Sequence, residues 1–159
     1  MAARSIATRM GPALNHVIDS TQTGFLPNRW IGDNVLSHLE EIAYLQETQL
    51  PGVILFLDFQ KAFDRIDRGW IERCTAAVGF GDGMQRWVHI LHAGTSARVA
   101  FNGWHTATFP VRSGVFQGSP LSPLLFVLAT QPMAAHARRT ATALQPRQLP
   151  SGHQIPVMH

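Results

Sequence analysis

Asp58 is the residue whose position in this chain most suggests chemistry. It ends a run of five apolar residues, Val53 to Leu57, that follows Pro51-Gly52. A short uninterrupted apolar run is typical of a central strand covered on both faces, although the run alone does not exclude other structures. A carboxylate buried at the tip of such a strand needs a cation, a metal ion or a hydrogen-bond donor, because burying it alone costs on the order of several kcal/mol. A solvated turn aspartate is the alternative.

Two other stretches have residue types suited to phosphates and sugars. Residues 22–34, QTGFLPNRWIGDN, form a turn-rich loop with Arg29, whose planar cationic fork fits phosphate oxygens. Taken alone, Arg29 is equally an ordinary surface arginine. Residues 112–126, RSGVFQGSPLSPLLF, contain Gly118, which allows a substrate to approach the backbone closely. Ser119 or Ser122 can cap the helix that follows.

In this order, the three stretches resemble the motifs of reverse transcriptases, most closely those encoded by non-LTR retrotransposons. The matching residues are Gln22, Gly24, Phe25, Arg29, Asp33, Asn34, Asp58, Ala62, Phe63, Gln117, Gly118, Pro120, Leu121, Ser122, Pro123 and Phe126. The resemblance implies an α+β fold: the fingers and partial palm of a right-hand polymerase, with an incomplete palm sheet. It implies a fingers-like helical region over residues 1–52, a partial palm over residues 53–139 and an irregular tail over residues 140–159.

The resemblance also implies roles for individual residues. Asp58 would be the catalytic residue and would bind both magnesium ions, Mg²⁺ being the expected cofactor. Phe63 would press on the sugar of the incoming nucleotide and exclude a 2′-hydroxyl. The nucleotide-binding residues would be Arg29, Phe59, Ala62, Phe63, Gln117 and Gly118. The implied partners are an RNA template, a DNA primer and deoxynucleoside triphosphates.

Three features depart from the family pattern. Phe116 stands where arginine is usual, and Ser119 stands where aspartate or cysteine is usual. The next family element, a hairpin carrying Ala-Asp-Asp, does not occur in the sequence, so we expect a chain truncated before that motif. Two-metal chemistry needs several carboxylates, and we expect Asp64 and Asp67 to be turn and helix-start residues instead of ligands. We therefore expect the chain alone to be inactive.

Charge is distributed unevenly along the chain. All ten acidic residues lie at or before Asp82, whereas residues 83–159 contain six arginines and no acid. Such a half-chain suits a phosphate backbone, although scattered solvated arginines give the same composition. A second hypothesis is therefore a non-catalytic nucleic-acid-binding remnant of a retroelement. A third is an inert, poorly folded product, because the apolar strand would have an unpaired edge.

The single cysteine, Cys74, excludes an internal disulfide framework and is expected to be buried on a helix. No apolar run approaches the roughly 20 residues that cross a bilayer, so we expect no membrane partner. We expect an intracellular protein of the nucleus or cytoplasm that is not secreted. Residues 2–18 are basic, as in a transit peptide, but their apolar spacing favours an amphipathic helix interrupted near Gly11-Pro12.

The remaining elements form the scaffold. Apolar periodicity predicts helices over residues 33–47, 68–78 and 84–92. The apolar stripe of the first helix is expected to pack against the rest of the protein. Trp70 of the second helix and Trp87 of the third are expected to point inward. His89 and His92 stand three apart, a weak signal for a metal pair. Residues 98–111 predict a hairpin in which Phe101 faces Trp104 across an Asn102-Gly103 turn. A last helix runs to about residue 139, with a kink or a second segment at Pro132.

Overall fold

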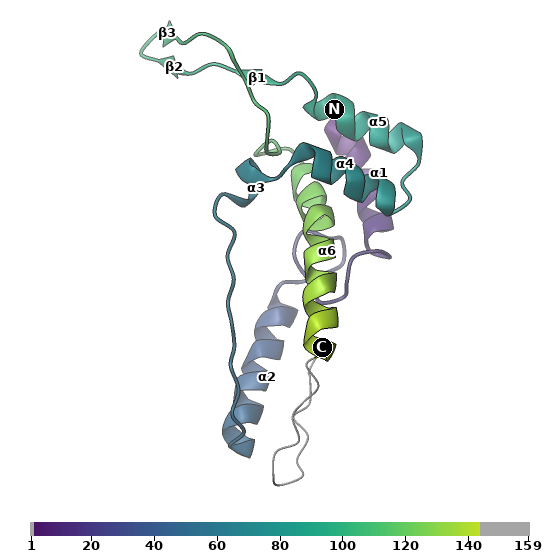
Figure 1. The fold of residues 1–159 in the computed structure, drawn as a ribbon, viewed down its shortest axis with the longest axis vertical. Helices are drawn as coiled ribbons and strands as arrows, with labels where there is room; N and C mark the ends of the chain where they lie inside the picture. Colours follow the sequence, from purple (N-terminus) through teal and green to yellow (C-terminus); the bar gives the residue numbers. More distant parts are fainter. Residues whose placement is uncertain (1, 144–159) are drawn as a thin grey trace.

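Helices and two short antiparallel ladders make up the fold of the computed structural model, which describes residues 2–143 (Figure 1). In chain order the elements are α1 (Ala2–Leu14), α2 (Gly32–Thr48), α3 (Ala62–Arg65), α4 (Arg68–Ala77), α5 (Asp82–His92), β1 (Ser96–Ala97), β2 (Ala100–Phe101), β3 (Trp104–His105), β4 (Phe109–Pro110) and α6 (Ser122–Ala143). Helix α6 packs against α1, α3 and α4, and α5 packs against α1 and α4. A mixed helical and antiparallel fold agrees with the expected α+β class.

The first half of α6 is the centre of the core. It is apolar on nearly every side, and a helix of that kind is stable only when other helices surround it. Its fully buried positions include Leu125 and Leu128, which are 0% and 1% exposed. The surrounding helices contribute Ile6, Met10 and Leu14 from α1, Ile71 and Cys74 from α4, and Val88 from α5. Each such side chain contributes about 1.5–3 kcal/mol by burial.

Helices α4 and α5 form where they were predicted. Asp67 caps α4 by accepting a hydrogen bond from the Trp70 backbone N–H at 2.6 Å, which confirms its helix-start role. Trp70 is only partly inward, since its indole donates to the Ala129 carbonyl at 2.8 Å while the side chain stays 38% exposed. The predicted burial of Trp87 is wrong, because this residue is 48% exposed and lies beside α1 on the rim of a cavity.

Neither proline within the long helical segments ends its helix. Helix α1 continues through Pro12 to Leu14, so the predicted interruption near Gly11-Pro12 is wrong. Helix α6 contains Pro132 and continues to Ala143, so residues 140–143 are helical instead of part of an irregular tail. The rest of that predicted tail, residues 144–159, lies outside the described residues. None of the helices between residues 2 and 143 combines the length and apolar character needed to cross a bilayer.

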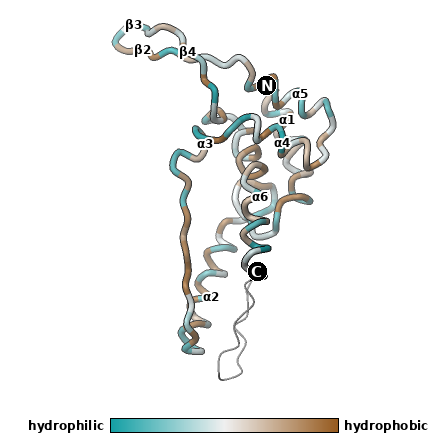
Figure 2. The backbone as a smooth tube through the Cα atoms, in the orientation of Figure 1, coloured by the Kyte–Doolittle hydropathy of each residue, from teal (hydrophilic) through white to brown (hydrophobic). Residues whose placement is uncertain are grey.

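Residues 53–57 do not form the predicted central strand. They are extended without strand pairing, and Val53, Leu55 and Leu57 are 94%, 76% and 79% exposed. An apolar strand needs neighbours that pair with its edges and cover its faces, and no described segment does so. The segment instead runs alongside α2 (Figure 1), and Figure 2 shows its hydrophobic colouring on the outside of the molecule.

The apolar stripe of α2 is also uncovered, so its predicted packing is wrong. No residue of this helix is buried, and Val35, Leu36 and Leu39 are all more than half exposed. Its contacts with the extended segment include a T-shaped pair of the His38 and Phe56 rings, with centroids 6.1 Å apart. We call α2 and the segment that follows it, residues 32–57, the arm. The arm leaves the helical core as a separate projection (Figure 1).

The predicted hairpin is confirmed. Asn102 and Gly103 have φ values of 45° and 80°, the left-handed pair that a type I′ turn requires. Phe101 pairs with Trp104 next to this turn, and Ala97 pairs with Phe109 nearer the base. The register shifts by one residue between the two ladders, so residues 107 and 108 lie opposite Arg98, as in a β-bulge.

Candidate functional site

The loop of residues 113–118 is fastened to α3 by main-chain hydrogen bonds. The Gly114 N–H donates to the Ile66 carbonyl and the Val115 N–H donates to the Phe63 carbonyl, both at 2.8 Å. The Ser113 hydroxyl adds a bond to the Asp64 carbonyl at 3.1 Å. Two motifs separated by about fifty residues in the sequence, around Phe63 and around Gln117, are thereby held side by side.

Gly114 is the residue that permits this close approach. Its φ is +82°, and a Cβ atom there would lie 2.7 Å from the Asp64 carbonyl oxygen and 2.9 Å from that of Phe63. Both neighbours are main-chain atoms that cannot move aside independently. Any side chain at this position would therefore push the loop away from α3.

A cavity of about 570 Å³ opens where the loop meets α3. Its lining includes Phe63, Phe116, Gln117, Gly118, Ser119, Pro120, Ser122 and Pro123. The Gln117 side-chain amide donates to the Asp64 carboxylate at 3.1 Å, which fixes its orientation. Asp64 lies in the short helix α3, whereas a turn position was predicted. The structure thus brings three predicted nucleotide-binding residues together: Phe63, Gln117 and Gly118.

A series of aromatic rings connects this cavity to its surroundings. Phe63 stacks on Phe126 of α6 with centroids 5.2 Å apart, and Phe25 meets Phe63 edge-on at 6.3 Å. Phe59 meets the other ring of the stack, Phe126, edge-on at 5.8 Å. Phe25 has a φ of 66°, a left-handed conformation that is uncommon for a bulky residue. The loop of residues 22–34 therefore reaches Phe63 through Phe25.

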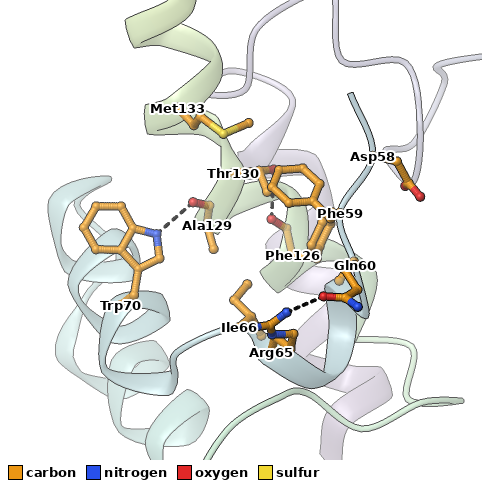
Figure 3. Close-up of a pocket in the computed structure, with 11 residues that line it drawn as sticks. Asp58, Phe59, Gln60, Arg65, Ile66, Trp70, Phe126, Ala129, Thr130 and Met133 are labelled. Atoms are coloured by element: carbon orange, nitrogen blue, oxygen red, sulfur yellow. Dashed lines mark hydrogen bonds between the residues drawn. The ribbon is translucent and has the colours of Figure 1, made fainter. Parts of the chain in front are cut away.

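Asp58 lies on a second cavity, of about 480 Å³ (Figure 3). The lining includes Asp58, Phe59, Gln60, Ala62, Arg65, Ile66, Trp70, Phe126, Ala129, Thr130 and Met133. Asp58 is exposed, and its carboxylate points away from the other lining side chains. Since Phe126 lines this cavity and Phe63 lines the other, the stacked pair lies between them. The structure brings Asp58 together with Phe59 and Ala62 but not with Gln117.

Asp58 by itself does not complete a metal site. Within residues 2–143, no three or more histidine, cysteine, aspartate or glutamate side chains are grouped so that they could hold a metal ion. Two-metal chemistry needs several converging carboxylates, so the described residues do not fit a pair of magnesium ions. His89 accordingly bonds to Glu72 at 2.7 Å, and the His92 Nδ1 lies 2.8 Å from the Val88 carbonyl.

Arg29 holds its own loop together. Its guanidinium donates to the carbonyls of Asp19, Gln22, Asn15 and Ile18, the last three at 2.7, 3.1 and 2.9 Å. These bonds tie the end of α1 to the turn before α2, and they use the donors that a phosphate would need. All of these contacts are to carbonyls of the chain itself. That Arg29 lies beside nucleotide phosphates or the template therefore stays a prediction.

Arg68 is a second partly buried arginine that bonds to main-chain carbonyls, and the sequence contains no signal that distinguishes it from a surface arginine. It donates to the carbonyls of Gly114, His92 and Val111 at 2.8, 2.7 and 2.8 Å, and burial lowers the pKa of its guanidinium. Its guanidinium carbon also lies 5.9 Å from the centroid of the Phe116 ring. Arg68 therefore anchors both ends of the segment between α5 and the Gln117 loop.

Comparison with known proteins identifies the relatives of this chain. A family model described as "Reverse transcriptase (RNA-dependent DNA polymerase)" matches residues 2–153. An uncharacterized 149 kDa protein of transposon TX1 from Xenopus laevis is 32% identical over 144 residues, which cover 91% of this chain and 11% of that protein. The Pol polyprotein of the type-2 retrotransposable element R2DM from Drosophila melanogaster is 32% identical over 123 residues, covering 77% of this chain and 11% of that protein.

A third relative is the Pol polyprotein of the type-1 retrotransposable element R2 from Popillia japonica. It is 37% identical over 86 residues, covering 52% of this chain and 14% of that protein. The chain thus spans between 11% and 14% of the length of these relatives.

Proposed function

The chain belongs to the reverse transcriptase family, of the type encoded by non-LTR retrotransposons, and on this premise we propose that it supplies the fingers and part of the palm of such an enzyme. The family carries out RNA-templated DNA synthesis with divalent metal ions. The observation that carries the proposal is the family match over residues 2–153. The arrangement of Phe63, Gln117 and Gly118 around one cavity supports it.

We assign the incoming nucleotide to this cavity and the neighbouring one. In this assignment the Phe63 ring contacts the sugar, and Gln117 and Gly118 line the space for the sugar and the nascent base pair. Phe59 and Ala62 would act from the cavity next to Phe63. Template RNA and primer DNA would be the macromolecular partners. The fingers would comprise residues 1–52 and the partial palm residues 53–139.

Asp58 would be the contribution of this chain to a magnesium site. Carboxylates beyond the described residues would be required, so we propose that the chain alone does not extend a primer. Primer extension on an RNA template with magnesium tests this proposal directly. Extension by the isolated chain that Asp58→Ala abolishes would contradict it.

A chimera tests the assigned function itself. Residues 2–143 would replace the matching stretch of an active reverse transcriptase, with Asp58→Asn and Asp67→Asn as paired variants. Asp67 caps α4, so its substitution controls for the loss of one nearby carboxylate. We expect similar extension by the chimera and the Asp67→Asn variant, and far slower extension by the Asp58→Asn variant.

A second candidate function is nucleic-acid binding without catalysis, and the acid-free stretch from residue 83 onward favours it. Affinity for RNA should then fall steeply as salt rises, because released counterions drive the binding. Affinity that does not change with salt would exclude this mode. For either function we propose an intracellular site of action, in the nucleus or cytoplasm.

A further inference from the structure

The hairpin tip exposes two aromatic residues that the core does not use. Phe101 and Trp104 are 80% and 81% exposed, the highest values among the aromatic side chains of the described chain. They pair across the turn, so both side chains lie on the same side of the hairpin. In the part of the chain that the structure describes, neither ring contacts another aromatic ring. About four fifths of each side chain is therefore open to solvent and accessible to a ligand.

The surroundings of this tip carry positive charge and no carboxylate. Arg98 lies in the hairpin itself and is exposed, and Arg112, also exposed, follows the last strand at the base of the hairpin. No aspartate or glutamate occurs after Asp82, so the whole hairpin is free of acidic residues. Because side chains alternate along a strand, Arg98 leaves the face opposite the two rings, three residues from Phe101 and about 10 Å away along the strand. That length corresponds to about three nucleotides at the 3.4 Å rise of a stacked strand.

The hairpin is held firmly at its base while its tip extends away from the helices. Val111 N–H donates to the Thr95 carbonyl at 2.9 Å, and the Arg68 guanidinium donates to the Val111 carbonyl at 2.8 Å. Figure 1 shows the β2–β3 tip at the far end of this projection, away from α6. Residues at the base are thus fixed by α4, whereas Phe101 and Trp104 are presented to solvent on a fixed support.

We infer that the tip of this hairpin is a stacking surface for single-stranded nucleic acid, with Phe101 and Trp104 under the bases and Arg98, about 10 Å away, beside a phosphate farther along the strand. Exposed aromatic rings flanked by cations bind single strands because every base has a face that can stack. A duplex does not offer such faces, so unpaired RNA or DNA is the occupant. This inference rests on the proposed nucleic-acid partner but not on nucleotidyl transfer.

Charge also disfavours a second copy of the hairpin as the occupant. Two hairpins meeting through their tips would bring no opposite charges together, because the hairpin carries Arg98 and no acidic residue. A polyanion, in contrast, neutralises Arg98. The charge pattern therefore favours a nucleic acid over self-association through this surface.

The test measures binding of the full chain to a labelled oligouridine RNA of about 12 nucleotides by fluorescence anisotropy across a salt series. Trp104→Leu should weaken binding about 5- to 150-fold, the range found for the loss of one stacked base. Trp104→Leu should leave the slope of log affinity against log salt unchanged, because it removes no charge. Arg98→Gln should instead lower the slope of log affinity against log salt by about 0.7, the value for one phosphate of a single strand.

Two further variants separate stacking from folding. Trp87→Leu removes a half-exposed tryptophan from α5 and should bind like the wild type. Trp104→Phe keeps an aromatic face and should retain most of the affinity. Because Trp104 is 81% exposed, Trp104→Leu should leave the unfolding midpoint in urea within error of the wild type.

Three outcomes would overturn the inference. The first is RNA affinity that Trp104→Leu and Phe101→Leu leave unchanged, and the second is equal affinity for a duplex of the same length. The third is self-association in sedimentation that Trp104→Leu abolishes while RNA affinity stays the same. None of these outcomes bears on the role of Asp58, because that role is tested by nucleotide incorporation. An inactive chimera, in turn, would not affect the measurement of RNA affinity on the chain itself.

Discussion

Replacing Gly114 by alanine adds one methyl group where the Gln117 loop crosses α3. The new Cβ would lie 2.7 Å from the Asp64 carbonyl oxygen, and the φ of +82° is unfavourable for any residue with a Cβ. Gly118 has the same φ of +82° with nothing within 4 Å of the position of a Cβ. The two substitutions therefore share the conformational penalty and differ only in the steric one.

The expected losses of unfolding free energy follow from this difference. A left-handed alanine costs about 1–2 kcal/mol, and about 0.4–1 kcal/mol returns because alanine restricts the unfolded chain, so Gly118→Ala should cost about 1 kcal/mol. Gly114→Ala should also weaken the two 2.8 Å bonds that Gly114 and Val115 donate to α3. At about 1 kcal/mol for each hydrogen bond, its total should reach about 3 kcal/mol.

Urea denaturation of the two variants measures this difference. A gap of about 2 kcal/mol corresponds to a difference in midpoint of about 1 M at the m-values usual for small proteins. Equal midpoints for the two variants, and so equal losses of unfolding free energy, would refute the close approach of the loop to α3.

Three further predictions concern single side chains. Arg29→Lys should lower the unfolding free energy by about 2–3 kcal/mol in urea titrations, because an ammonium cannot donate to carbonyls on several sides at once. The control Arg112→Lys, at an exposed position, should change the unfolding free energy by less than about 0.5 kcal/mol. Equal effects of the two substitutions would contradict the role of Arg29. Burial raises the pKa of Asp19, but hydrogen bonds from Thr21 and Arg138 outweigh it and hold that pKa below the ordinary 3.8. The stability from Asp19 is thus present above pH 3.8 and lost as the pH falls toward the lowered value, and Asp19→Asn should remove this part of the acid dependence of the urea midpoint. Burial raises the pKa of the Cys74 thiol despite nearby Arg73, so iodoacetamide should modify it far more slowly in the native protein than in urea, and equal rates would place it at the surface.

Local signals predicted the elements whose structure depends on neighbouring residues in the sequence. Asn102-Gly103 specifies a left-handed turn whatever surrounds it, and Asp67 caps α4 through a residue three positions on. The burial of Ile71 and Cys74 followed from helical periodicity, because α6 is present to cover them.

Burial that depends on distant partners could not be predicted in this way. The apolar run at residues 53–57 and the stripe on α2 have the composition of covered elements, yet no described segment covers them. Arg29 and Arg68 illustrate the same limit for polar groups. Their type and spacing do not show that loop carbonyls converge on them, since only the folded path of the chain creates that geometry.

The rate of single-nucleotide incorporation by the chimeric reverse transcriptase tests the role of Asp58 most directly. If residue 58 binds the catalytic metal ions, Asp58→Asn should slow incorporation on the order of 1,000-fold, since losing several kcal/mol of transition-state stabilisation removes about three powers of ten. The Asp67→Asn chimera should stay within a few-fold of the parent. Equal rates for the two variants, with the parent chimera active, would contradict the assignment of Asp58 as the metal-binding residue.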